Sequence, residues 1–301
     1  MPSQQPASLR NIESRAAWGM LAPAMTLLII FIVVPFFLAF LLSLTNERLI
    51  PRPIPTKWTG IRNYIRVLTD PDFWQALRNT FWFTFFIVPV QSSIGLGLAL
   101  LINRQFKGNH IFRGIYFLPT VVPMVMVAII WAGLLQAPEG VINGILRQIS
   151  FDQIGPYDWL HHEWLAMPTI MLMSTWQGVG FQMIIYLAGL QNIPKELYEA
   201  ARIDGANLWQ LFWFITLPLL RNTHIVVLIT TTILAFKLFT QVEVLTQGGP
   251  LGATNSLVRY IYVAGFQYQK VGLAAAASVI FFLIVLAIAL CQHHLIQTDK
   301  D

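Results

Sequence analysis

Long stretches without a charged side chain constrain this chain more than any other feature. Five windows contain no Lys, Arg, Asp or Glu: residues 16–46, 79–103, 114–138, 164–194 and 271–298. A sixth stretch, 222–242, is interrupted only by Lys237. A charge in the bilayer core costs several kcal/mol and a helix needs about 20 residues to cross it, so each stretch can hold one crossing. We therefore predict an all-α membrane protein with six transmembrane helices, over residues 18–45, 79–102, 114–136, 166–190, 218–244 and 272–295.

The composition excludes the main classes of soluble protein. Hydrophobic residues make up 56% of the chain and charged residues only 11%, whereas a soluble domain has about 25% charged residues. The single cysteine, Cys291, lies in an apolar run, which leaves no intrachain disulfide and no cysteine-rich metal site. The 19 basic residues are scattered among 14 acidic ones, a pattern that predicts a lipid bilayer as partner and no nucleic acid.

The two ends of the chain are expected on the same side of the membrane, because six crossings return it to the starting side. The first apolar run is too long for the core of a signal peptide, so we interpret it as an uncleaved anchor. We expect tails at residues 1–17 and 296–301 around a transmembrane domain at 18–295. Lys and Arg divide equally between the two sides, so the positive-inside rule does not choose the orientation.

The segment between the fourth and fifth predicted crossings, residues 191–220, has clear helix boundaries. Pro194 fits the first position of a short helix, residues 195–203 favour its continuation, and Gly205 can end it because glycine adopts a left-handed conformation without penalty. Asn207 can then cap a second helix over 208–217. The pattern leaves two interpretations open: an interfacial helix that lies on lipid, or a lever that fits a groove on a soluble partner.

A family resemblance bears on this segment. Its residues resemble the EAA signature of permease subunits of ATP-binding-cassette (ABC) importers: Glu199-Ala200-Ala201, three residues, Gly205, nine residues, then Ile215-x-Leu217-Pro218. The resemblance implies a cytoplasmic coupling helix that docks on an ATPase subunit. It implies that both termini are cytoplasmic in a multi-pass protein of the bacterial inner membrane. The residues implied in coupling are Glu199, Ala200, Ala201, Asp204 and Gly205.

Other motifs resemble the sugar-type permeases, the group of the maltose "F" and glycerol-phosphate "A" subunits. These motifs are Gly60-Ile61-Arg62-Asn63-Tyr64, Leu118-Pro119-Thr120 and Gln247-Gly248-Gly249-Pro250. The resemblance implies the type I ABC importer permease fold, with a core at 75–295 and the coupling loop at 191–220. The implied function is import of a sugar or sugar-like solute: an oligosaccharide, a glycosylglycerol-type osmolyte or a glycerol phosphate.

The same resemblance implies the partners of the chain. They are a second homologous permease, two copies of an ABC ATPase and an extracytoplasmic solute-binding protein. The chain itself is expected to be no enzyme and to hold no cofactor, because it lacks the G-x-x-x-x-G-K-[ST] loop that cradles a triphosphate. ATP is therefore expected on the partner subunit.

Polar and aromatic residues inside the fourth and fifth predicted helices suggest a path for a hydroxyl-rich solute. By resemblance the path includes Ser174, Gln177, Gly178, Phe181, Thr231, Ala235 and Leu238; the residue types add Trp176 and Lys237. Ala235 and Leu238 replace polar positions of the maltose permease, which argues against maltose as the solute. The alternative is that small residues here serve close helix packing. Lys237 is expected to extend to the membrane surface or to face a water-filled cavity.

Two further possibilities follow from the residues. An ion-coupled secondary transporter or a channel would need a carboxylate within the spans, and Glu243, near a helix end, is the nearest candidate. The adjacent pairs His161-His162 and His293-His294 lack the spacing of a zinc motif. We assign no catalytic residue and no metal ligand.

Overall fold

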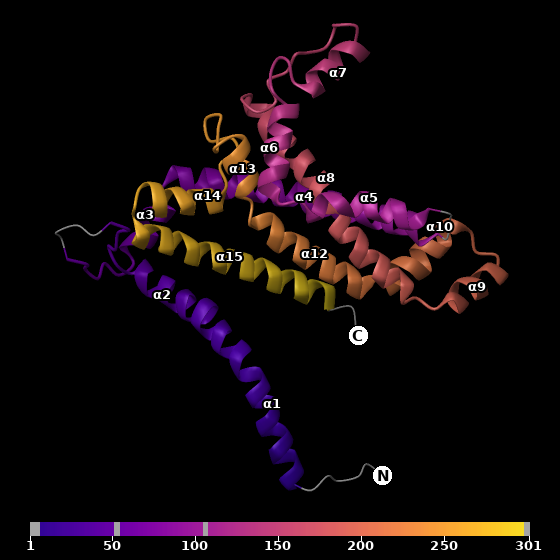
Figure 1. The fold of residues 1–301 in the computed structure, drawn as a ribbon, viewed down its shortest axis with the longest axis horizontal. Helices are drawn as coiled ribbons and strands as arrows, with labels where there is room; N and C mark the ends of the chain where they lie inside the picture. The colour runs from indigo at the N-terminus through magenta and orange to yellow at the C-terminus, as the bar shows by residue number, and fades with distance from the viewer. Residues whose placement is uncertain (1–6, 51–54, 105–107, 298–301) are drawn as a thin grey trace. The chain divides into compact units, whose positions relative to one another are not determined.

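The fold is helical throughout the residues that the computed structural model describes, 7–50, 55–104 and 108–297 (Figure 1). Apart from an isolated bridge between Thr45 and Trp58, all regular secondary structure in these ranges is helix. The chain forms two compact units: unit 1 comprises Met1–Val67 and Ala264–Ile280, and unit 2 comprises Leu68–Val263 and Phe281–Asp301. Parts of the two predicted tails, 1–6 and 298–301, lie outside the described residues.

Five helical segments among the described residues are long and apolar enough to cross a membrane. They are Ala17–Ser43, Pro71–Asn103, Glu163–Gln191, Arg221–Leu245 and Val271–Gln292. A sixth crossing is formed if the bent pair α5 (Asn109–Val121) and α6 (Met124–Leu134) counts as one span. The structure therefore confirms an all-helical membrane fold with five to six apolar spans.

The expectation of an unbroken helix over residues 114–136 is wrong. Helices α5 and α6 meet at an angle of 96°. The break falls at Val122, whose backbone is extended with φ −73° and ψ 131°, directly before Pro123. A proline disfavours the helical conformation at the residue before it, and here this preference coincides with the end of the helix.

The expectation of one continuous helix over residues 218–244 is also wrong. The span consists of α12 (Arg221–Phe236) and α13 (Thr240–Leu245), with three non-helical residues between them. The main-chain carbonyl of Leu238, which lies in this break, accepts a hydrogen bond of 2.5 Å from Ser256 Oγ. The break leaves this carbonyl without a helical partner, and Ser256, in the loop before the last span, supplies one.

Unit 1 contains α1 (Ala7–Leu28), the π-helical turn η1 (Ile29–Val33), α2 (Val34–Ser43), the start of α15 (Val271–Gln297) and most of α3 (Arg62–Leu68). Asn63 holds the end of α2, because its Nδ2 donates to the carbonyls of Ser43 and Thr45 at 2.8 and 2.7 Å. Gly272 passes the same carbonyl so closely that a Cβ would lie 2.1 Å from Thr45 O. These contacts give Asn63 of the Gly60–Tyr64 motif a structural role.

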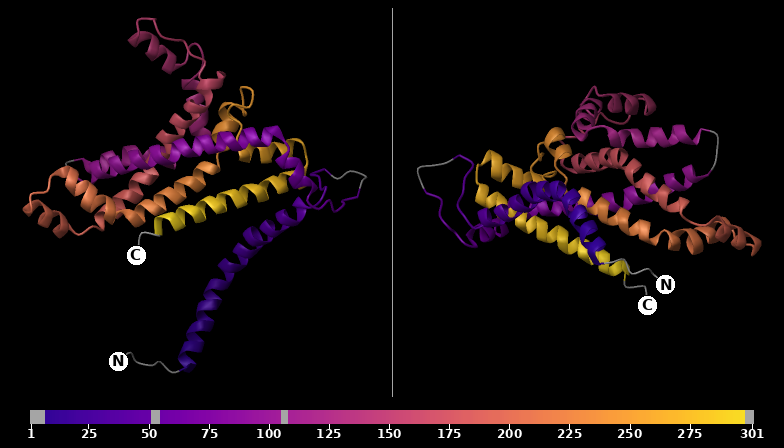
Figure 2. Two further views of the ribbon diagram at one scale, coloured as in Figure 1. Left: turned by 180° about the vertical axis from the view of Figure 1, so that it is seen from behind. Right: turned by 60° about the horizontal axis from the view of Figure 1, so that its bottom comes forward.

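Unit 2 is built around α4 (Pro71–Asn103) and α8 (Glu163–Gln191), which pack along each other (Figures 1 and 2). Helices α12 and α5 pack against this pair, and α13 packs on α6. One apolar cluster joins α4, α6, α8, α12 and α13, and a second joins α4, α8 and α12. In both views of Figure 2, α7 (Val141–Ile149) and α9 (Lys195–Ile203) lie at different ends of unit 2.

Candidate functional site

Helix α9 and the turn after it have the geometry that the sequence predicts. Gly205 has φ +83°, and its N–H donates to Arg202 O at 3.1 Å. The next N–H, of Ala206, donates to Ala201 O at 2.9 Å. This pair of bonds is the Schellman motif, in which a left-handed glycine satisfies the last helix carbonyls. The helix begins one residue later than expected, with Pro194 as its N-cap.

The helix that follows α9 starts with a complete cap. Asn207 Oδ1 accepts from the N–H of Gln210 at 2.9 Å, and Gln210 Oε1 accepts from the N–H of Asn207 at 2.8 Å. This capping box begins α10 (Leu208–Leu211), which continues through the π-helical turn η2 (Phe212–Thr216) into α11 (Leu217–Leu219). Pro218 lies inside α11 rather than at the start of the span.

The residues expected to couple to a partner lie on α9 and its turn, mostly on the surface. Glu199, Ala200, Asp204 and Gly205 are exposed and Ala201 is half-buried. Ile203, at the end of the helix, is 87% exposed. Tyr198 lies on the other side of α9 and packs against the apolar cluster of α4, α8 and α12. The helix therefore presents a free face with glutamate, small and aliphatic side chains.

Two of the expected path residues belong to a buried polar network between α4, α8 and α12. Gln91 Nε2 donates to Ser174 O at 2.7 Å, and Gln182 Nε2 donates to Gln91 Oε1 at 3.0 Å and to Thr231 Oγ1 at 3.1 Å. Gln241 Nε2 lies 3.5 Å from Ser174 Oγ. In an apolar surrounding, amide and hydroxyl groups that bond across helices hold the helices in one register. Gln182 Oε1 is the buried atom of this network that has no partner among the described residues.

The other predicted residues of α8 are less buried. Trp176 is 48% exposed and its ring centroid lies 5.8 Å from that of Trp131 on α6. Gln177 and Phe181 are half-buried. The carbonyl of Gln177 accepts from Thr120 Oγ1 at 2.9 Å. A Cβ on Gly178 would lie 2.6 Å from Gln91 Nε2, so this glycine admits the glutamine side chain between the helices.

The predicted residues around the break after α12 lie in different surroundings. Ala235 and Leu238 are buried in the apolar cluster that joins α6, α8 and α13. Lys237 is exposed and is the C-cap residue of α12. Its ammonium group is therefore not buried inside an unbroken helix, and the structure does not bring it into the glutamine network.

Sequence reasoning missed Gln91 of the network and the Trp131 ring as neighbour of Trp176. Gln91 was the detectable residue, since a glutamine in a charge-free window needs a hydrogen-bond partner in lipid. Which partner it has depends on contacts with residues more than 80 positions away. No local pattern reveals such a contact.

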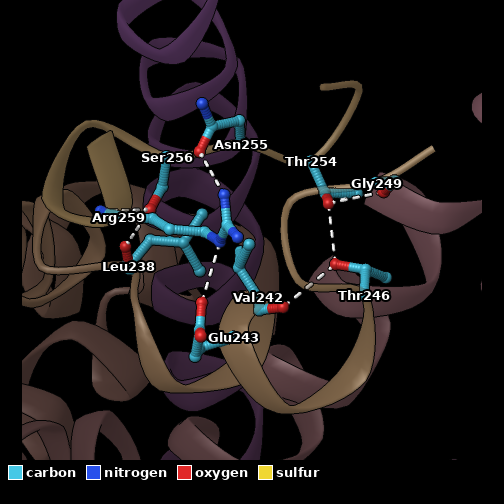
Figure 3. A network of polar contacts seen from close by, with 9 residues as sticks. All are labelled: Leu238, Val242, Glu243, Thr246, Gly249, Thr254, Asn255, Ser256 and Arg259. Carbon is cyan, nitrogen blue, oxygen red and sulfur yellow. Dashed lines mark hydrogen bonds and ion pairs between the residues drawn. The ribbon is translucent and has the colours of Figure 1, made fainter. Parts of the chain in front are cut away.

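A second polar network fixes the loop before the last span (Figure 3). Arg259 Nε donates to Glu243 Oε2 at 2.8 Å, and Arg259 Nη1 donates to Asn255 Oδ1 at 3.3 Å. Thr246 and Thr254 share a hydrogen bond of 2.7 Å, and Thr254 Oγ1 donates to Gly249 O. The Glu243 carboxylate is thus paired within the chain.

The histidine pair between α7 and α8 has local partners. His161 Nδ1 lies 2.9 Å from Asp158 Oδ1, and the N–H of Trp164 donates to His162 Nδ1 at 3.3 Å. Slight burial raises the pKa of the Asp158 carboxyl and the hydrogen bond with His161 lowers it, with a net shift below the ordinary value. No group of three His, Cys, Asp or Glu is placed to hold a metal ion in the described ranges. The side chain of His293 lies outside them.

Known proteins resemble this chain over nearly its full length. The family described as binding-protein-dependent transport system inner membrane component matches residues 91–298. The trehalose/maltose transport system permease protein MalF of Thermococcus litoralis is 35% identical over 291 residues, 95% of each chain. The lactose transport system permease protein LacF of Rhizobium radiobacter is 34% identical and covers 100% of both chains.

The fold also matches a solved structure. A chain of a bacterial ABC transporter involved in the import of the acidic polysaccharide alginate superposes with a TM-score of 0.83 and 25% sequence identity. The match covers 98% of this chain and 100% of that one. The ABC importer permease fold that the resemblance to sugar-type permeases implies is therefore confirmed.

Proposed function

Because the chain belongs to the family of binding-protein-dependent transport system inner membrane components, we propose that it is the permease subunit of an ABC importer for a sugar. The chain is not itself an enzyme, since the family supplies the membrane component of the transport system. We further propose that α9 is its coupling helix. One observation carries this assignment: α9 is held at its C-terminal end by a Schellman turn and is exposed along one face.

The fixed C-terminal end and the exposed face of α9 suit a lever. The Schellman turn at Gly205 and the capping box at Asn207 set the direction in which the chain leaves α9 and enters α10. Its nine residues are roughly 14 Å long. Glu199 on the exposed face offers a charge, and Ile203 offers an apolar contact. A groove with basic residues around an apolar floor would fit this face.

The sugar class rests on the relatives. Two proteins that align with nearly the whole chain are named for trehalose and maltose and for lactose, and the superposed structure belongs to an alginate importer. We propose an oligosaccharide or similar hydroxyl-rich solute for this chain. Ser174, Gln177, Thr231 and the Trp176 ring would offer the amide, hydroxyl and aromatic groups that such a solute needs.

We propose that the two ends of α8 lie on the two sides of the membrane. This single apolar helix leads from the loop that contains α7 to the segment that contains α9. We place α9 and both termini in the cytoplasm of a cell with this chain in its inner membrane. Two ABC ATPase subunits and a second permease would complete the complex, and the solute-binding protein would dock on the side of α7.

The alternative of an ion-coupled transporter has less support. Glu243, its candidate carboxylate, is paired with Arg259 at 2.8 Å in the loop before the last span. The family is one of binding-protein-dependent systems, which favours the importer.

Copurification tests the proposed function. The tagged chain is expressed with its neighbouring transport subunits, purified in mild detergent and assayed for a bound ATPase. We expect stoichiometric ATPase with the wild type, less with Glu199→Ala, and no change with Glu139→Ala, an exposed glutamate at the other end of unit 2. Sugar uptake into vesicles should require ATP. Purification without an ATPase, together with uptake that a proton ionophore abolishes while ATP depletion does not, would overturn the proposal.

A further inference from the structure

Thr216 lies where the helix after α9 departs from regular α-helical geometry. It is the last residue of the π-helical turn η2 and is almost fully buried. Its hydroxyl has two neighbours: Leu211 O at 3.2 Å and the Tyr198 hydroxyl at 3.0 Å. Single π-helical turns within α-helices are frequent at functional sites. Here the turn places a buried hydroxyl opposite α9.

The donors of these two bonds follow from the groups involved. A carbonyl oxygen can only accept, so Thr216 Oγ1 donates its one proton to Leu211 O. The Thr216 hydroxyl must then accept from Tyr198, whose phenolic O–H is the donor. Tyr198→Phe removes this donor and leaves the ring, which packs against the cluster that includes Phe212 and Leu217.

This contact joins two segments that the chain connects only through a turn. It is a side-chain hydrogen bond from α9 to the turn η2. The two segments are also joined by the Schellman bonds, the capping box and apolar packing. Apolar packing resists separation, but it fixes rotation less well than a directed hydrogen bond.

We propose that the Tyr198–Thr216 hydrogen bond makes α9 and the start of the fifth span move as one body. Tyr198 and Thr216 are thereby positioning residues for coupling: they touch neither solute nor nucleotide and act by holding α9 against the span. This inference rests on the proposed role of α9 as the coupling helix. When the bond is present, a movement of the docked ATPase displaces α9 and the start of the fifth span together. A larger part of that displacement then reaches α12.

Variants in the complete importer, reconstituted with its ATPase and solute-binding protein, test this role. Tyr198→Phe and Thr216→Val each remove the bond, and Thr216→Ser keeps the hydroxyl while it loses the methyl group. Tyr116→Phe is the matched control, because the Tyr116 hydroxyl has no hydrogen-bond partner among the described residues and its ring packs on the same cluster. Sugar transported per ATP hydrolysed and the amount of bound ATPase are measured for each.

We expect sugar per ATP to fall about two- to tenfold in Tyr198→Phe and Thr216→Val, the change in population that one hydrogen bond supports. Bound ATPase stays at the wild-type level. Thr216→Ser and Tyr116→Phe transport like wild type, and the double variant Tyr198→Phe/Thr216→Val loses no more than either single variant. Unchanged sugar per ATP in both single variants, or a Thr216→Ser variant as poor as Thr216→Val, overturns the proposal.

A spectroscopic distance separates this proposal from the proposed function. Spin labels are attached at positions 197 and 219, both exposed and neither assigned to the docking face, in a Cys291→Ala background. We expect the same narrow distance distribution in the nucleotide-free and ATP-trapped wild type, and a broader one in trapped Tyr198→Phe. If Glu199→Ala loses the ATPase but Tyr198→Phe leaves distances and transport unchanged, only the inference fails. If the complex forms without any requirement for α9, the proposed function of α9 fails.

Discussion

Gly189 on α8 lies so close to Thr223 on α12 that a Cβ on the glycine would be 2.4 Å from Thr223 Oγ1. The same Cβ would lie 3.0 Å from Leu220 Cδ2. One turn away, Tyr186 O–H and His224 Nδ1 are 2.6 Å apart. Small residues allow helices in membranes to approach closely. These contacts hold α8 against α12, the two helices that the α9 segment connects.

Replacing Gly189 with alanine should destabilise the protein by about 1–3 kcal/mol, because the methyl group overlaps α12. Gly97→Ala is the control: Gly97 is also inside a helix, and nothing lies within 4 Å of its Cβ position. That variant should be neutral or more stable by up to about 1 kcal/mol. Thermal unfolding in detergent measures both, and Thr223→Ala should recover part of the loss. Equal melting temperatures for the two glycine variants would contradict the close approach.

The ion pair between Arg259 and Glu243 should contribute more to stability than the one between Arg147 and Asp152. Both are 2.8 Å long, but the side chains are 15% and 27% exposed in the first pair and 51% and 72% in the second. Glu243→Gln should cost about 1–3 kcal/mol, and Asp152→Asn at most about 1 kcal/mol. Unfolding in denaturant compares the variants. Equal losses would show that burial does not distinguish the pairs.

The hydrogen bond from Tyr260 O–H to Asp70 Oδ2, 2.7 Å long, predicts a pH dependence. Burial, then the bond to Asp70 and its charge, raise the pKa of Tyr260 above the usual value of 10.0. A raised pKa in the folded state stabilises the protein below the unfolded pKa, and this contribution is lost as pH rises further. The wild type should therefore lose its stability advantage over Tyr260→Phe above about pH 10. A constant difference between the two melting curves from pH 7 to 11 would argue against the bond.

The parts of the molecule that the sequence could predict are those governed by local chemistry. Gly205 and Asn207 end one helix and begin the next through bonds to residues at most five positions away, so their pattern is readable. The bend at Pro123 also had a local signal, since a proline disfavours the helical conformation at the residue before it. Counting charge-free residues did not reveal the bend, because residues 114–138 contain no charge on either side of it.

The network around Gln91 and Gln182 could not be predicted in the same way. Both amides lie in apolar helices, and their partners are 49 to 91 positions distant. The pairing depends on how α4, α8 and α12 are rotated about their axes, which is set by the whole packed unit. For Ser174 and Thr231 the sequence identified polar residues correctly but not the neighbours with which they bond.

Those neighbours predict two classes of behaviour among the expected path residues. Thr231→Val removes an acceptor of Gln182, so it should lower stability by about 1–3 kcal/mol. Trp176→Ala removes a half-exposed ring whose recorded partner is Trp131, so stability should change little. If the solute passes Trp176, the KM for sugar uptake should rise severalfold in this variant. Uptake kinetics and thermal unfolding of both variants distinguish residues that contact the solute from residues that only pack helices together. If Trp176→Ala changes the melting temperature but not the KM, the ring serves packing.

We expect Gly205 to be required for transport because of its left-handed backbone conformation. Steric crowding by neighbouring residues is not the reason. Its φ is +83° and nothing lies within 4 Å of its Cβ position, so a side chain meets no steric overlap with other residues. A left-handed conformation costs an L-residue about 1–2 kcal/mol, and a β-branched residue more. Gly205→Val should therefore reorient α9 and reduce sugar uptake about tenfold or more, while the chain remains in the membrane. Gly205→Asn, which tolerates the same conformation, should transport at close to the wild-type rate. Normal uptake by Gly205→Val at equal membrane abundance would show that the direction of α9 does not control coupling.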